Sequence, residues 1–71
     1  MRGEDEALTH VLDIIRSEFV EMPGLSLTRA QIQRLWALDA AITELVIAAL
    51  TRSGFLRVEQ GRYSRAGLDR P

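Results

Sequence analysis

The chain has 71 residues, with nine basic and ten acidic side chains, one histidine and no cysteine, and its formal net charge is −1. A chain of this length supports one small hydrophobic core, so we expect a single domain over residues 1–71. The lack of cysteine excludes disulfides and thiolate metal ligands, and a single histidine excludes the zinc motifs built on histidine pairs. We therefore expect no metal site and no cofactor.

The sequence has none of the segments typical of membrane or secreted proteins. No apolar run approaches the ~20 residues that a helix needs to span a bilayer. The chain starts with Met-Arg-Gly-Glu-Asp-Glu, which is acidic where a signal peptide would be basic and then apolar. We expect a cytoplasmic protein without membrane contact.

The charges are divided unequally along the chain. Residues 1–27 hold two arginines and six carboxylates, a net charge of −4, whereas residues 28–71 hold seven arginines and four carboxylates, a net charge of +3. Every basic residue is arginine, which favours bidentate contacts with phosphate or carboxylate. A genomic bias in composition is the alternative explanation for this usage.

Residues 5–21 have the spacing of an amphipathic helix, i, i+3, i+4, i+7. Its expected core side chains are Leu8, Val11, Leu12, Ile15 and Phe19. Pro23-Gly24 ends the helix. His10 and Asp13 fall on the polar side, where a lone histidine is usually incidental, so we assign them no catalytic role.

Residues 25–27 alternate in polarity and predict a strand of three residues. Thr28-Arg29-Ala30-Gln31 then fits a capping box, which predicts a second helix that begins at Thr28 and ends near Ala37. Leu27 and Ile32 flank the cap as a hydrophobic staple. The expected core side chains of this helix are Ile32, Leu35 and Trp36.

Asp39 is the natural N-cap of a third helix, which runs to about Ser53 before Gly54 provides a left-handed C-cap. We expect Phe55 to fold back onto the end of this helix. The expected core stripe consists of Ile42, Leu45, Val46, Ala49 and Leu50. That choice leaves an outer face made of Ala40, Ala41, Thr43, Glu44, Ile47, Ala48 and Thr51.

The last predicted element is a β-hairpin. Its strands are residues 55–59 and 62–64, and Gln60-Gly61 is a plausible two-residue turn in which glycine adopts a positive φ. In this register Val58 faces Tyr63, and Glu59 pairs with Arg62 across the strands. Residues 66–71 form a loose tail.

The order helix, strand, helix, helix, hairpin predicts an α+β fold with three helices and an antiparallel sheet of two or three strands. At this point the chain resembles the winged helix-turn-helix superfamily, and in particular small stand-alone bacterial winged-helix proteins. Three stretches carry the resemblance together with the third helix: Leu27-Thr28-x-x-Gln31, Leu35-Trp36-x-Leu38-Asp39, and Gly54-Phe55-Leu56 followed by Gly61-Arg62-Tyr63. They cover about residues 8–65.

The resemblance implies binding of double-stranded DNA, as in a transcription regulator, with the third helix in the major groove and the hairpin against the backbone. Arginine–phosphate contacts would supply most of the affinity. The candidate arginines are Arg29, Arg34, Arg52, Arg57, Arg62 and Arg65. For Arg62 the expected pair with Glu59 is the simpler role, whereas Arg57 and Arg65 have no obvious local partner.

The outer face of the third helix leaves a second function open. Residues 39–51 contain no Arg, Lys, Asn or Gln, the side chains that usually read bases. The alternative is a protein-interaction or dimerisation module that uses the same face, with Ile47 as its central apolar residue. The division of charge also permits a homodimer. We expect no enzyme activity, since the sequence has no nucleophile–base pair and no glycine-rich phosphate loop.

Overall fold

The computed structural model describes the backbone of residues 2–67 and the side chains of residues 6–67. The elements are α1 (Arg2–Glu21), β1 (Ser26–Thr28), α2 (Arg29–Leu35), α3 (Ala40–Arg52), β2 (Leu56–Glu59) and β3 (Arg62–Arg65). This order confirms the predicted α+β class. Most of the tail predicted at 66–71 lies outside the described residues.

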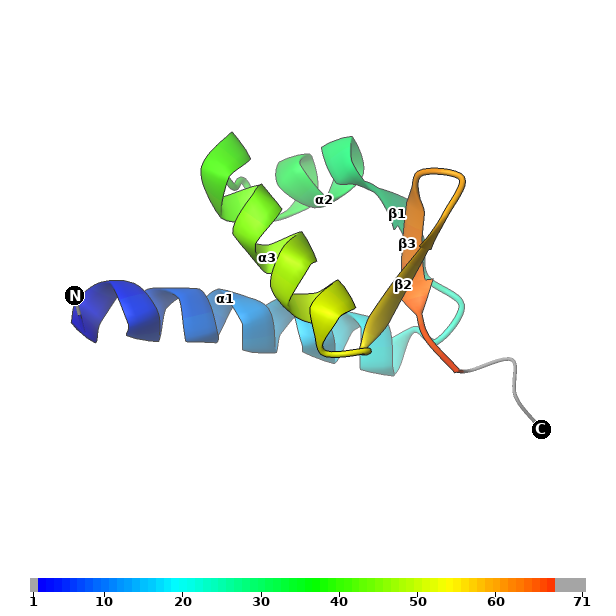
Figure 1. Cartoon of the computed structure of the whole chain (residues 1–71), viewed down its shortest axis with the longest axis horizontal. Helices are drawn as coiled ribbons and strands as arrows, with labels where there is room; N and C mark the ends of the chain where they lie inside the picture. The colour runs from blue at the N-terminus through cyan, green and yellow to red at the C-terminus, as the bar shows by residue number, and fades with distance from the viewer. Residues whose placement is uncertain (1, 68–71) are drawn as a thin grey trace.

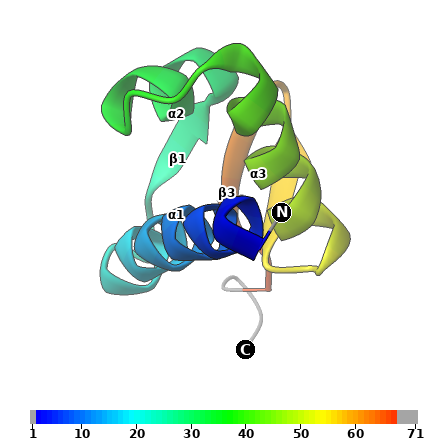
Figure 2. The ribbon, with the colours of Figure 1, turned by 90° about the vertical axis from the view of Figure 1, so that its left-hand side faces the viewer.

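The helices lie on one side of a small sheet (Figure 1). The long helix α1 runs along the bottom of the view, α3 crosses it, and α2 lies at the far end of α3. The view along α1 separates α1 from α2 and shows β1 connecting them (Figure 2). The first turns of α1 extend beyond the other elements (Figure 1), which contributes to principal extents of 41 × 21 × 20 Å.

The sheet is antiparallel, has the strand order β1-β3-β2, and therefore places β3 in the centre. Its register confirms the predicted pairing of Val58 with Tyr63 and of Glu59 with Arg62. The hairpin turns at Gln60 (φ 52°) and Gly61 (φ 77°), and two consecutive positive φ angles are typical of a type I′ turn. The predicted two-residue hairpin is thus confirmed.

Local side-chain chemistry begins the second and third helices. Thr28 Oγ1 accepts a hydrogen bond from the Gln31 backbone N–H at 3.2 Å, and Gln31 Oε1 accepts one from the Thr28 N–H at 2.8 Å. Asp39 Oδ1 accepts from the Ile42 N–H at 2.8 Å. These bonds satisfy N–H groups that have no partner within the helix. Both predicted N-caps are confirmed.

The same type of cap ends both of these helices. After α3, Gly54 (φ 85°) donates to Thr51 O at 3.1 Å, and Phe55 donates to Leu50 O at 3.0 Å. This pair of bonds defines a Schellman motif and confirms the predicted C-cap. After α2, Leu38 donates to Gln33 O at 2.9 Å, and the left-handed position is Ala37, with φ 53°. Helix α2 consequently ends at Leu35, earlier than predicted.

The core is formed by all three helices and the inner face of the sheet. Its buried hydrophobic residues are Ile15, Phe19, Ile32, Val46, Ile47, Leu50, Leu56 and Tyr63. Leu35 was predicted in the core, but it is 61% exposed. The buried side of this segment is formed by Ile32 and by Trp36, one turn later at i+4, which packs against the core, and Leu35 lies outside that side.

The predicted stripe of α3 is confirmed at Val46 and Leu50, which are each 1% exposed, but it is wrong at Leu45, which is 52% exposed. Thr43 is fully buried and Ile47 is 5% exposed, although both were expected on the outer face. The buried side is therefore turned around the helix axis toward Thr43 and Ile47, and the buried set 43, 46, 47, 50 still has helical spacing. Helix α3 is apolar on more than one side, so periodicity alone does not select the buried side. Thr43 tolerates burial because its hydroxyl donates to Asp39 O at 2.8 Å.

Candidate nucleic-acid interface

The outer face of α3 is small and mostly uncharged. Ala40, Ala41 and Glu44 are exposed as predicted, and Ala48 is half-buried. The correction at Thr43 and Ile47 removes two of the seven side chains that we assigned to this face. Leu45 takes the place of Ile47 as its large apolar residue.

An ion pair joins α2 to this face. Arg29 Nε lies 2.8 Å from Glu44 Oε2, and both side chains are about half exposed. The contact neutralises the only carboxylate among the exposed residues of α3 and orients Arg29 toward the same surface. Because exposed ion pairs contribute only ~0–1 kcal/mol, a phosphate group can compete for this arginine at small cost.

Arg34 lies in the last turn of α2 and is exposed. Among the side chains that the structure describes, none forms an ion pair with it. Its position near the helix C-terminus is also favourable for a cation without any ligand. Of the α2 arginines, Arg34 is therefore the one whose charge is not already compensated by a described carboxylate.

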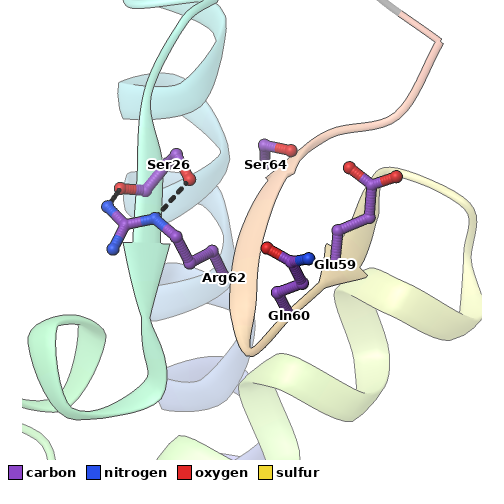
Figure 3. Close-up of a pocket in the computed structure, with 5 residues that line it drawn as sticks. All are labelled: Ser26, Glu59, Gln60, Arg62 and Ser64. Atoms are coloured by element: carbon purple, nitrogen blue, oxygen red, sulfur yellow. Dashed lines mark hydrogen bonds between the residues drawn. The ribbon is translucent and has the colours of Figure 1, made fainter.

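Arg62 crosses from the central strand to β1 (Figure 3). Its Nε donates to Ser26 Oγ at 3.0 Å, and its Nη2 donates to the Ser26 carbonyl oxygen at 2.9 Å. The predicted ion pair of Arg62 with Glu59 is therefore wrong, although the two residues are register partners. The reason is that a residue on the central strand has a neighbour on each side, and Ser26 offers two acceptors to the guanidinium. Glu59 instead lies 3.6 Å from Arg57 Nη2, so the expectation that Arg57 lacks a local partner is wrong.

The face of the sheet away from the helices is polar. Side chains alternate along each strand, so the buried Tyr63 places its neighbours Arg62 and Ser64 on the opposite face. The register adds Ser26, Arg57 and Glu59 to that face. A shallow pocket of about 420 Å³ lies there, lined by Ser26, Glu59, Gln60, Arg62 and Ser64 (Figure 3).

Two predicted phosphate contacts lie apart from these groups. Arg52 is exposed at the C-terminal end of α3, which lies beside α1 at the opposite end from α2 (Figure 1). The Arg65 guanidinium stacks on the Phe55 ring at 4.6 Å, and Arg16 lies 5.6 Å from the centre of the same ring. Arg65 Nε is buried and has no hydrogen-bond partner among the described residues. This geometry favours a packing role for Arg65, because its guanidinium lies over the Phe55 ring and its Nε is buried.

A feature that the sequence analysis missed lies on the other side of α3. An apolar groove of about 610 Å³ separates α3 from α1, and its lining includes Leu8, Val11, Leu38, Ile42 and Leu45. The available signal was the excess of apolar residues on α3. Ile42 and Leu45 were assigned to the core, but α3 carries more apolar side chains than the core can take.

No protein-family model, no curated protein and no solved structure matches this chain. The structure itself defines an α+β domain, in which three helices and a β-hairpin surround one core and the sheet has three antiparallel strands. Among the described residues, no helix is long and apolar enough to cross a membrane. The same residues contain no cluster of potential metal ligands.

Proposed function

We propose that this protein is a winged helix-turn-helix DNA-binding protein that acts in transcription regulation. The observation that carries the proposal is spatial. Helix α2, the N-terminal end of α3 and the β2–β3 turn lie along one edge of the molecule in both views (Figures 1 and 2). When these elements lie along one edge, a helix can enter a groove of the duplex while the hairpin contacts the DNA backbone.

The cations near this edge would supply the affinity. Arg29 and Arg34 belong to α2, and Arg62 follows the hairpin turn directly. The bonds to Ser26 hold the Arg62 guanidinium in place, so less side-chain entropy is lost when it meets a phosphate. Each phosphate contact contributes about −0.9 to the slope of log affinity against log salt concentration.

The exposed residues of α3 support low sequence specificity. Ala41 and Ala48 can contact a thymine methyl group, and Glu44 can accept a hydrogen bond from cytosine only after it leaves Arg29. None of these residues forms the bidentate contacts that discriminate strongly between bases. We therefore expect DNA of different sequences to bind with similar affinity.

The experiment is a titration of a fluorescent mixed-sequence duplex, followed by anisotropy at about 50 and 200 mM salt. Arg34→Ala should weaken binding several-fold at low salt and reduce the salt slope by about 1. Arg52→Ala is the matched control, because it removes an arginine from the last turn of α3 at the opposite end of that helix. The proposal fails if the wild type does not bind DNA at the lower salt concentration. If Arg34→Ala and Arg52→Ala lose the same amount of DNA affinity, the DNA-binding surface is not the one assigned here.

A second candidate function, association with protein, is favoured by one specific observation. Leu45 is about half exposed in the middle of α3 and lines the groove beside α1. The protein-interaction module that the sequence left open therefore stays a second proposal, with Leu45 in place of Ile47 as its central apolar residue.

A further inference from the structure

The ion pair between α2 and α3 has the geometry of a phosphate contact. Arg29 Nε lies 2.8 Å from Glu44 Oε2, and Arg29 Nη2 donates to Glu44 Oε1 at 3.4 Å. One edge of the guanidinium therefore meets both carboxylate oxygens, and arginine binds two oxygens of a phosphate group in the same way. The Glu44 carboxylate takes the position that a phosphate would take on this arginine.

The pair is accessible from solvent. The side chain of Arg29 is 52% exposed, and that of Glu44 is 57% exposed. Of the four residues one helical turn from Glu44, Ile47 is buried and the other three are alanines. A phosphate group that approaches along α3 therefore meets no long side chain from these neighbours.

The two partners open to Arg29, carboxylate and phosphate, differ little in free energy. An ion pair between exposed side chains gains little, because water screens it and two flexible side chains must be held in one geometry. A phosphate of duplex DNA releases condensed counterions when an arginine neutralises it, so it competes best at low salt. The phosphate can displace Glu44, but DNA affinity is lowered by the cost of breaking the ion pair.

The displaced carboxylate adds a second cost. Glu44 is the only acidic residue of α3. Once it leaves Arg29, it lies close to the phosphate that Arg29 binds, and the two negative charges repel each other. Both costs disappear when residue 44 keeps its shape and loses its charge.

We propose that Arg29 forms a phosphate-binding subsite at the junction of α2 and α3, and that Glu44 is a built-in competitor which occupies this subsite in the free protein. The inference rests on the proposed function, since its ligand is a phosphate of the DNA backbone. It adds to that function the residue that limits how tightly DNA is held.

The first test compares the wild type with Glu44→Gln in the anisotropy titration with a mixed-sequence duplex at about 50 and 200 mM salt. Glutamine has nearly the same size and no charge. Glu44→Gln should bind DNA about threefold to tenfold more tightly at the lower salt concentration, with a salt slope steeper by up to about 1. If the wild type binds DNA and Glu44→Gln binds it no more tightly, this inference is wrong and the proposed function stands. If neither protein binds DNA, the proposed function itself fails.

A double variant separates the arginine subsite from simple charge repulsion. Arg29→Ala in the Glu44→Gln background removes the cation after its competitor is gone. This change should cancel the gain in DNA affinity and reduce the salt slope by about 1. If the double variant binds DNA as tightly as Glu44→Gln does, Arg29 makes no phosphate contact and the subsite does not exist.

Glu21→Gln is the matched control. It makes the same change at the last residue of α1, which is exposed, and α1 and α2 lie on opposite sides of the molecule in both views (Figures 1 and 2). Its DNA affinity should stay within about twofold of the wild type, because salt screens charges that lie far apart. An equal gain in Glu21→Gln and Glu44→Gln would show an effect of net charge alone and would contradict the proposal. Circular dichroism of each variant establishes that it is folded.

A measurement on the wild type needs no variant. The NMR signal of the Arg29 Nε–H group reports the partner of this guanidinium, and it should move when the duplex is added at about 50 mM salt. Inorganic phosphate at the same ionic strength should leave the signal in place, because a free phosphate carries no condensed counterions to release. A signal that stays at its free position with DNA bound would show an intact ion pair, and an equal change with inorganic phosphate would assign the subsite to free anions. Either result would overturn the proposal.

Discussion

Arg62 and Ser26 form a two-point contact across the sheet: Nε donates to Ser26 Oγ at 3.0 Å and Nη2 donates to Ser26 O at 2.9 Å. The two residues are 36 positions apart in the chain, so the contact connects the segment after α1 to the hairpin. A planar guanidinium suits this pair of acceptors, because its Nε and Nη2 can donate at the same time to the hydroxyl and to the carbonyl oxygen.

Arg62→Ala should lower the free energy of unfolding by about 1 kcal/mol, since it removes two hydrogen bonds at an exposed site. Arg62→Lys should recover only part of this loss, because an ammonium group does not reproduce the fork. Urea denaturation followed by circular dichroism gives both values. If Arg62→Lys has the wild-type free energy of unfolding, the positive charge and not the two-point geometry stabilises the fold.

Ala37→Gly should stabilise the protein. Ala37 has a φ of 53° at the left-handed position after α2, a conformation that costs about 1 kcal/mol for a residue with a Cβ and little for glycine. We expect the free energy of unfolding to rise by about 0.5–1 kcal/mol in thermal or urea unfolding. Ala41→Gly, in the first turn of α3, is the control and should lower stability by up to about 1 kcal/mol.

Gly54→Ala is the reciprocal change at the end of α3. A Cβ at Gly54 would meet no atom within 4 Å, so no clash contributes to its effect. The φ of 85° remains unfavourable for alanine, and the free energy of unfolding should fall by about 1–2 kcal/mol. If the urea midpoint of unfolding does not change, the backbone of the C-cap must adjust to alanine without loss of stability, and the prediction is wrong.

Ile47→Glu should unfold the domain or destabilise it by more than about 3 kcal/mol, because it places a carboxylate in the core. Leu45→Glu, two residues earlier on the same helix, should leave the fold intact because its side chain is half exposed. Thermal unfolding of the two variants compares them directly. The opposite ranking would restore the predicted stripe of α3 and contradict the structure.

Much of the fold could be predicted because it depends on local chemistry. The capping box at Thr28, the N-cap at Asp39, the C-cap at Gly54 and the turn at Gln60-Gly61 are bonds or φ angles within a few residues. Steric limits on φ and unsatisfied backbone groups restrict the choices at such positions. The strand register followed from the length of the turn.

The candidate sites depended on contacts between distant residues, and there the predictions were less accurate. Glu59 and Arg62 are register partners in the hairpin, but the Arg62 guanidinium binds Ser26 instead. Ser26 belongs to β1, which lies outside the hairpin. Arg29 meets Glu44 because α2 and α3 pack together. Competition between two or more partners is decided by positions in space, which spacing along the chain does not specify.

The sequence by itself determined the type and order of the elements and placed their ends to within a few residues, because caps, turns and steric restrictions act over short distances along the chain. Only the tertiary structure decided which side of α3 is buried. The predicted stripe at 42, 45, 46, 49 and 50 and a second stripe at 43, 46, 47 and 50 both fit the helical period and share residues 46 and 50. Packing against α1, α2 and β2 selects the second stripe, buries Ile47, and leaves Leu45 exposed beside the groove.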